Sequence, residues 1–291
     1  MSDGTGIEWT EATWNPTTGC DRVSAGCDNC YALTLARRLR AMGNPKYQND
    51  GNPRTSGPGF ALTPHVDQLS LPHRWKSPRV IFVNSMSDLF HPEVPAEFIE
   101  DVFQVMADTP RHTYQVLTKR SKRLAALAER LPWPDNVWMG VSVESDQYCF
   151  RVRHLRSVPA AVRFVSAEPL LGPLDSIDLD GIDWLIAGGE SGHHARPMHP
   201  RWVLELRDKC VGADVPFFFK QWGAWTPSDD LGAVPVAVDG AVLQDDHTDT
   251  DLVAAVPGSP VPMRRVGKKS AGRVLDGETW DQMPRPLLKR T

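Results

Sequence analysis

Short apolar runs alternate with helix-like stretches along most of the sequence, and this alternation constrains the fold more than any other feature. Strands are expected at Arg79–Asn84, Tyr114–Leu117, Val137–Val143, Arg163–Ser166, Trp184–Ala187 and Val215–Lys220, with a first strand near Ala12–Pro16. Helical spacing occurs at Tyr31–Met42, Pro95–Ala107 and Lys122–Arg130. Such alternation is typical of parallel strands joined by right-handed crossovers. The sequence therefore predicts an α/β fold, a partial or complete β/α (TIM-like) barrel.

Two segments interrupt the alternation and divide the chain. Residues 44–71 are crowded with Pro, Gly and Asn, and residues 226–262 are rich in Asp, Val and Pro, so both are expected to be loops. We predict that residues 1–225 form the barrel, including a loop for an iron-sulfur cluster. Residues 226–291 are predicted to be a loop-rich C-terminal extension with a basic segment.

Composition and charge limit the setting of the protein. No apolar run approaches the roughly 20 residues that span a bilayer. The N-terminus lacks the basic-then-apolar pattern of a secretory signal. We therefore expect a cytoplasmic protein without a membrane partner. The net charge of -4 argues against non-specific adhesion to nucleic acid, but it does not exclude a local basic patch.

Three of the five cysteines are bunched in one short segment, at Cys20, Cys27 and Cys30, while Cys149 and Cys210 stand alone. In a reducing compartment the bunching suggests a metal site rather than disulfides. The two isolated cysteines are expected to be buried core thiols, because Cys210 ends an amphipathic run.

Polar residues follow five of the predicted strands. The carboxyl ends of parallel strands meet at one rim, where catalytic groups of β/α barrels collect. Any single polar residue there could be a helix cap, but the set predicts a site. The segments concerned are Asn84–Asp88, Thr118–Arg120, Ser142–Glu144, Ser166–Pro169 and Gly188–Gly192.

The cysteine segment follows the predicted first strand, so it should open on the same rim. A [4Fe-4S] cluster needs four ligands, and three thiolates leave one iron open to S-adenosylmethionine. The alternative is a structural zinc site, which would need a fourth protein ligand at suitable spacing after Cys30. The residues favour the open cluster, but their spacing leaves both alternatives open.

The C-x6-C-x2-C run at Cys20–Cys30 resembles that of a phage- and prophage-associated three-Cys-motif family related to the radical S-adenosylmethionine superfamily. The resemblance extends over nearly the whole chain. Further matching stretches are Ile81–His91, Val116–Arg120, Val165–Leu170, Gly188–Gly192, Phe219–Gly223 and Val266–Lys269.

The resemblance implies a radical S-adenosylmethionine enzyme: a partial β/α barrel that binds a [4Fe-4S] cluster and S-adenosylmethionine and generates a 5'-deoxyadenosyl radical. It implies a separately encoded three-Cys-motif partner and a reductant protein such as flavodoxin or ferredoxin. The superfamily's usual spacing is C-x3-C-x2-C, so the longer first gap here is a departure that concerns the loop conformation. The family's reaction is not assigned, so the resemblance names no substrate.

Position on the rim, read through this resemblance, suggests roles for individual residues. For S-adenosylmethionine we expect Ser85, Met86 and Asp88 at the amino group, and Thr118, Lys119, Ser142 and Glu144 at the ribose and carboxylate. Gly188 and Gly189 would let the backbone approach the ligand. Glu168 and Glu190 would face substrate or adenine, and Lys220 with Gln221 would close the site. For Glu168 and Lys220 the alternative is a plain salt bridge at the barrel mouth.

The basic stretch Arg264–Arg273 precedes an aromatic residue, Trp280, and could hold a phosphate backbone and stack a base. A solvated tail is the alternative. Three hypotheses follow: a radical enzyme that modifies or repairs nucleic acid or nucleosides, a radical enzyme acting on a peptide or small metabolite, and a zinc protein that is structural or hydrolytic.

Overall fold

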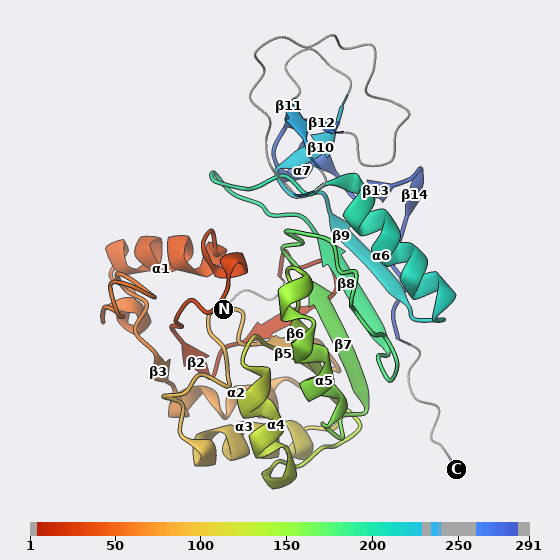
Figure 1. Ribbon diagram of the computed structural model, residues 1–291. Helices are drawn as coiled ribbons and strands as arrows, with labels where there is room; N and C mark the ends of the chain where they lie inside the picture. The colour runs from red at the N-terminus through yellow and green to blue at the C-terminus, as the bar shows by residue number, and fades with distance from the viewer. Residues whose placement is uncertain (1–4, 229–233, 238, 240–259, 285–291) are drawn as a thin grey trace.

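The computed structural model describes residues 5–228, 234–237, 239 and 260–284 of the 291-residue chain, and a curled parallel sheet dominates it (Figure 1). Seven strands are hydrogen-bonded in the order β1-β4-β5-β6-β7-β8-β9, so the sheet is a half-barrel with β1 and β9 as its edges. The strands are β1 (Ala12–Trp14), β4 (Val80–Val83), β5 (Thr113–Thr118), β6 (Val137–Ser142), β7 (Val162–Ala167), β8 (Trp184–Gly188) and β9 (Phe217–Gln221). The predicted α/β barrel is thus confirmed in its partial form.

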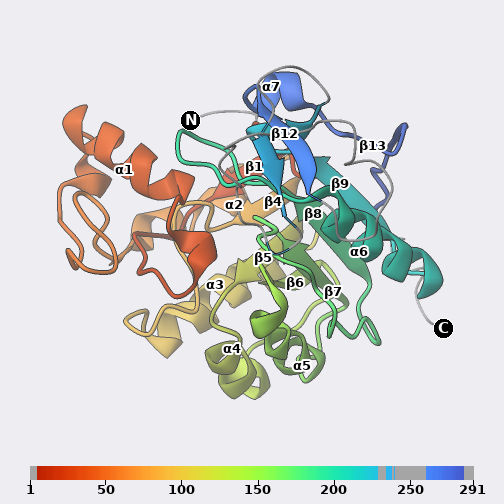
Figure 2. The same ribbon diagram turned by 45° about the horizontal axis from the view of Figure 1, so that its top comes forward.

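Helices connect the strands and cover one face of the sheet, with α3, α4 and α5 grouped together and α1 set apart (Figure 2). Their bounds are α1 (Tyr31–Ala41), α2 (Leu71–Arg74), α3 (Ala96–Asp108), α4 (Ser121–Leu127), α5 (Phe150–Arg156) and α6 (Pro200–Gly212). In α3 the residues Phe98, Val102 and Met106 recur at helical spacing and are buried against the sheet. The predicted strands and helices are all present, with ends shifted by one or two residues, except that α4 ends at Leu127, three residues before the predicted end, and continues as the short helix η4.

The sheet separates two apolar clusters, because alternate residues of a strand point to opposite faces. In β8, Leu185 and Ala187 join the large core under the helices, whereas Trp184 and Ile186 join a smaller cluster on the concave face. Trp9, Phe82, Phe164 and Phe218 complete that smaller cluster. Its aromatic side chains fill part of the concave face and leave the carboxyl ends of the strands for polar residues.

Shorter elements surround the half-barrel. The predicted loop at residues 44–71 holds only η2 (Pro45–Tyr47), β3 (Thr63–Pro64) and η3 (Val66–Gln68), and β3 pairs with β2 (Thr17–Thr18). The remaining one-turn helices are η1 (Ala25–Cys27), η4 (Ala128–Arg130) and η5 (Asp146–Tyr148).

The segment at residues 226–262, predicted to be a loop, contains strands where it is described, so that prediction is corrected. β10 (Trp225–Pro227) and β11 (Val234–Val236) pair with β12 (Val261–Arg265) in a small antiparallel sheet, because β12 supplies the hydrogen-bonding partner that local sequence cannot reveal. Residues 229–233, 238 and 240–259 of the segment lie outside the described residues. The last elements are α7 (Lys268–Ala271), β13 (Val274–Leu275) and β14 (Glu278–Thr279).

No helix in the described part of the chain is both long and apolar enough to cross a membrane.

Candidate iron-sulfur site at the open rim

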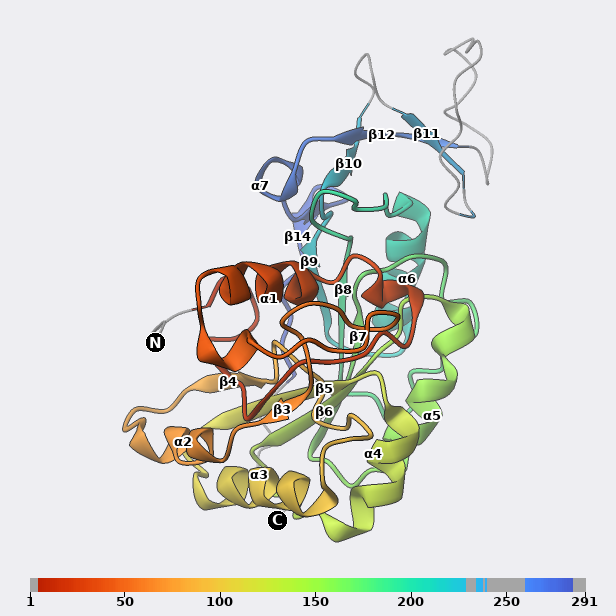
Figure 3. The same cartoon turned by 90° about the vertical axis from the view of Figure 1, so that its left-hand side faces the viewer.

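The three clustered cysteines lie between β2 and α1, and Cys27 is the last residue of η1. Figure 3 shows this segment of the chain leading into α1. Cys20, Cys27 and Cys30 are free and partly exposed. Gly19, just before the first of them, has φ +86, and a Cβ there would lie 2.0 Å from the carbonyl oxygen of Ala61. Only glycine combines this backbone conformation with so close an approach. The loop path therefore depends on a residue next to the first cysteine.

The thiols are near enough to influence one another. Burial is the main reason that the pKa of Cys20 is raised to about 12 and that the pKa of Cys30 is raised, and charge on Cys27 would raise both further. The apolar side chains of Met86, Leu33 and Ala36 pack around them. Metal binding here would have to displace thiol protons, and it would also neutralise the mutual repulsion of the thiolates.

Two side chains of the protein approach the sulfur atoms. Arg120 donates from Nη1 to Cys20 Sγ at 3.4 Å, and Ser24 Oγ lies 3.7 Å from Cys27 Sγ. Hydrogen bonds to the sulfurs of a metal site orient the ligands and tune the metal. Neither residue was predicted from the sequence, and Arg120 was passed over although it ends a predicted polar segment.

The polar side-chain atoms of Asp88 and Thr118 form hydrogen bonds within the protein. Asp88 accepts from Thr118 Oγ1 at 2.7 Å and from the backbone N–H of Lys119 at 3.0 Å, and it pairs with Arg120 at 3.0 Å. All these contacts join the end of β5 to the loop after β4. Both side chains fix the position of Arg120 beside Cys20, and their contact with a ligand stays a prediction.

Glu144 is fully buried beneath the cysteine loop. It pairs with Lys119 at 3.1 Å and Arg151 at 2.8 Å, and Ser24 Oγ donates to it at 2.6 Å. Burial alone would raise the pKa of Glu144, but the two cations outweigh burial and hold that pKa below its usual value. Ser142, also buried, contributes its carbonyl oxygen to Arg151 at 2.8 Å. Glu144 thus anchors the loop to the sheet.

Gly26 in this loop lies directly against Glu144, and a Cβ there would be 2.6 Å from Glu144 Cγ. Because Glu144 is held by two cations, we expect Gly26→Ala to lift the loop, at a cost of about 1–3 kcal/mol. Labelling of Cys27 and Cys30 by a thiol reagent should become about tenfold faster. Gly212→Ala is the control, since a Cβ at Gly212 meets nothing within 4 Å. Equal labelling rates in both variants would show that the contact does not hold the loop.

Glu190 holds the same loop through a second set of contacts. Arg196 donates to both of its carboxylate oxygens, at 2.6 and 2.9 Å, and reaches the carbonyl of Ala25 at 2.8 Å. Asn29 donates to Glu190 at 3.0 Å. The loop after β8 therefore holds the cysteine loop through these hydrogen bonds. Arg196 was missed because the polar segment considered after this strand ended at Gly192. Asn29 was missed because its partner Glu190 lies 161 positions away in the sequence.

Glu168 and Lys220 form an ion pair of 2.7 Å across the mouth of the half-barrel, as the simpler alternative proposed. Gln221 donates to Glu168 at 3.5 Å. At Gly189 the backbone is closely approached by the segment that follows β9, since a Cβ would lie 2.0 Å from the carbonyl oxygen of Trp222. An approach of the Gly189 backbone to a ligand stays a prediction. A Cβ at Gly188 would lie 3.3 Å from Glu168 Oε1.

Ser85 and Met86 lie between β4 and the cysteine loop. The carbonyl of Ser85 accepts from Tyr31 Oη at 2.5 Å, and its side chain bonds Asn15 at 3.2 Å. Met86 is buried and packs with Cys20 and Cys30. The structure thus places the cysteine loop against Ser85, Met86, Glu144 and Glu190, with Lys119 paired to Glu144, and it places Glu168 and Lys220 at the mouth.

The basic C-terminal segment is largely engaged by its own protein. Arg265 donates to the carbonyls of Gly192 and His193, Lys268 pairs with Glu8 at 3.0 Å, and Arg273 lies over the Phe218 ring at 4.9 Å. The nearby Trp280 packs edge-on against Phe217. These contacts leave the segment fewer free groups for a phosphate backbone than its sequence suggests.

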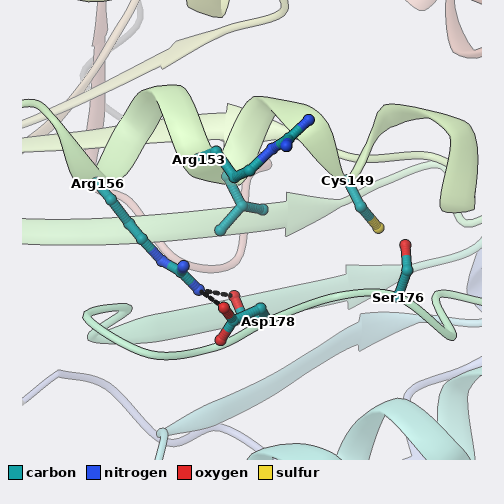
Figure 4. Close-up of a pocket in the computed structure, with 6 residues that line it drawn as sticks. Cys149, Arg153, Arg156, Ser176 and Asp178 are labelled. Carbon is teal, nitrogen blue, oxygen red and sulfur yellow. Dashed lines mark hydrogen bonds and ion pairs between the residues drawn. The ribbon is translucent and has the colours of Figure 1, made fainter.

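The two isolated cysteines are buried, as predicted. Cys210 is fully enclosed in α6. Cys149 precedes α5 and borders a pocket of about 350 Å³, where Arg156 pairs with Asp178 (Figure 4). Burial raises the pKa of Cys149 to about 11, so this thiol is not an activated nucleophile.

Comparison with known proteins gives a family match. Residues 4–284 match the model of a family described as a protein of unknown function (DUF5131). No curated protein matches the sequence. Two solved structures, both mutants of spore photoproduct lyase, are 13% identical, with TM-scores of 0.41 and 0.37. The matches cover 65% and 59% of this chain and 58% and 54% of those chains, so this protein spans little more than half of their length. At these values neither likeness carries an argument about function.

Proposed function

The chain belongs to the DUF5131 family, whose function is unknown, and from its own site we propose that it is a radical S-adenosylmethionine enzyme. One observation carries the proposal. Three partly exposed thiols lie in a single loop at the polar rim of a parallel half-barrel, and a cation donates to one of their sulfurs. The resemblance of the cysteine run to a phage-associated family related to that superfamily supports the same conclusion.

The donor set fits an iron-sulfur cluster with an open iron. Thiolates are the ordinary ligands of such clusters, and each can bind a different iron atom. Cys20, Cys27 and Cys30 would hold three irons and leave the fourth for S-adenosylmethionine. When bound, the cluster would supply one electron to the sulfonium, and breaking one carbon–sulfur bond would give methionine and a 5'-deoxyadenosyl radical.

The chain's own groups would prepare this site. Arg120 and Ser24 would donate to the ligating sulfurs, and Glu144, Glu190 and Arg196 would keep the loop in place through its backbone and side chains. The inward residues Ser142 and Lys220 share the concave face, with Glu168 beside Lys220, and would contact S-adenosylmethionine or substrate. If Lys119 contacted the carboxylate of S-adenosylmethionine, its ammonium group would have to pair with that carboxylate and with Glu144 at the same time.

The zinc alternative needs a fourth protein ligand beside the three cysteines. One histidine of this region is engaged elsewhere, since His91 pairs with Asp21 at 3.0 Å. We therefore favour the open cluster, which needs no fourth ligand from the protein.

The proposal is tested by reconstituting the protein anaerobically with iron and sulfide. We expect about four irons per chain. Dithionite reduction should give an electron paramagnetic resonance signal that changes when S-adenosylmethionine is added. Release of 5'-deoxyadenosine should accompany it. Stoichiometric zinc in the purified protein, together with failure to incorporate iron and sulfide, would refute the proposal.

The substrate class, the phage association and the three-Cys-motif partner are finer parts of the proposal. The net charge is -4, and most cations of the basic C-terminal segment already contact other groups of the protein. We therefore do not propose that this segment binds nucleic acid. Modification or repair of nucleic acid remains one proposed activity, and a peptide or small metabolite is the alternative. Comparing 5'-deoxyadenosine release with each substrate class added would separate them.

A further inference from the structure

A strongly basic pocket lies beside the cysteine loop, and it shares Lys119 and Arg120 with the proposed site. Its volume is about 360 Å³. Five of its lining residues are cationic, Lys119, Arg120, Lys122, Arg123 and Arg151, and none of its lining residues, all within the described part of the chain, is acidic. In a chain with net charge -4, such a pocket is a local reversal of sign.

The positive charge is only partly balanced by carboxylates. Glu144 is shared by Lys119 and Arg151, and Asp88 pairs with Arg120. Five cations against these two carboxylates leave an excess of three positive charges. Arg123 donates to the backbone carbonyls of His91 and Val94, which orients its guanidinium without neutralising it, and Lys122 is exposed.

The pocket is connected to the cysteine site through one side chain. Arg120 lines the pocket and also donates to Cys20 Sγ at 3.4 Å. Val23, which belongs to the same loop as the cysteines, borders the pocket and is 44% exposed. A molecule seated here would lie within a few side-chain lengths of the thiols without entering the half-barrel.

The shape of the patch suits a protein better than a nucleic acid. A polynucleotide is bound along a stripe of cations that follows its backbone. Here the cations are confined to the start of α4 and to Arg151, and apolar Val23 and Pro92 lie among them. Apolar and cationic side chains together are typical of a protein interface, and complementary charge speeds the encounter of two proteins.

We propose that this basic pocket is the docking surface for an acidic one-electron donor protein. The inference rests on the proposed function, because it assumes a cluster on the three cysteines. In the step it serves, the reduced donor loses one electron and the oxidised cluster gains it; no bond forms or breaks. Val23 and Arg120 lie close to the thiols, so the electron would have only a short path from the docked donor to the cluster.

Lys122→Glu tests the proposal with reduced flavodoxin, an acidic one-electron donor, as the probe. Lys122 contributes charge to the surface but does not contact a cysteine in the structure. The second-order rate of cluster reduction should fall about tenfold at low ionic strength. Raising salt from roughly 0.05 to 0.3 M should slow the wild type and shrink the difference. Lys269→Glu, the same change at an exposed residue of α7, should behave as wild type.

Two further measurements separate the possible outcomes. Reduced methyl viologen, a small cation, should reduce the cluster at least as fast in Lys122→Glu as in wild type, which shows that the cluster itself is intact. Equal flavodoxin rates in wild type and Lys122→Glu, without salt dependence, would overturn the docking proposal. The proposal would also be overturned if Lys122→Glu lost salt-sensitive binding of a single-stranded oligonucleotide while its flavodoxin rate stayed at the wild-type value. The pocket would then be a nucleic-acid surface. If dithionite finds no reducible cluster in wild type, the proposed function itself fails.

Discussion

Cys27→Ala should abolish release of 5'-deoxyadenosine and remove the response of the cluster signal to S-adenosylmethionine. Cys27 is the central member of the three thiols, since its charge acts on both Cys20 and Cys30, and Ser24 lies against its sulfur. Alanine supplies no ligand, so one iron would lose its protein contact. The measurement is chromatographic detection of 5'-deoxyadenosine beside electron paramagnetic resonance of the reduced protein.

Cys210→Ala is the matched control for this prediction. It removes the same thiol from a fully buried position in α6, outside the cysteine loop. We expect a small loss of stability, about 1 kcal/mol, with iron content and cleavage retained. If Cys27→Ala kept a wild-type signal and cleavage rate, the assignment of this loop as the cluster site would be wrong.

Glu144→Leu should lower the free energy of unfolding by about 3–5 kcal/mol. The side chain is fully buried, and its loss would leave Lys119 and Arg151 without their counter-ion. The side chain of Arg151 is only 3% exposed, so water cannot replace the carboxylate. Urea unfolding at neutral pH measures the change, and the loop should loosen with it because Ser24 loses its acceptor.

Glu205→Leu is the control, since Glu205 pairs with Arg201 on the exposed surface of α6. The same substitution there should cost less than about 1 kcal/mol. A further check is pH. Because the pKa of Glu144 is lowered in the folded protein, its contribution is complete above the unfolded pKa of about 4.3 and is lost as pH falls through the folded pKa. Comparable effects at Glu144 and Glu205 would contradict the role given to the buried carboxylate.

The buried ion pairs show where prediction from sequence ends. That Glu144, Asp88 and Glu168 follow strands, and would meet at one rim, could be predicted from the alternation of strands and helices. Which cation meets which carboxylate depends on strand order and loop path. Asp88 pairs with Arg120 because β4 and β5 are neighbours, and Glu144 reaches Lys119 because β5 and β6 are.

By itself the sequence determined an α/β fold of parallel strands, because strand periodicity and the helices between strands are local properties of the chain. It predicted a partial or a complete barrel, and the order of the seven strands, with β1 and β9 as open edges, was decided by the tertiary structure. Only the tertiary structure decided how the cysteine loop is held. Ser24, Asn29 and Arg196 act through contacts with residues that are 120 or more positions away. Long-range contacts of this kind leave no periodic signal in the sequence, since they arise when packed elements bring distant side chains together.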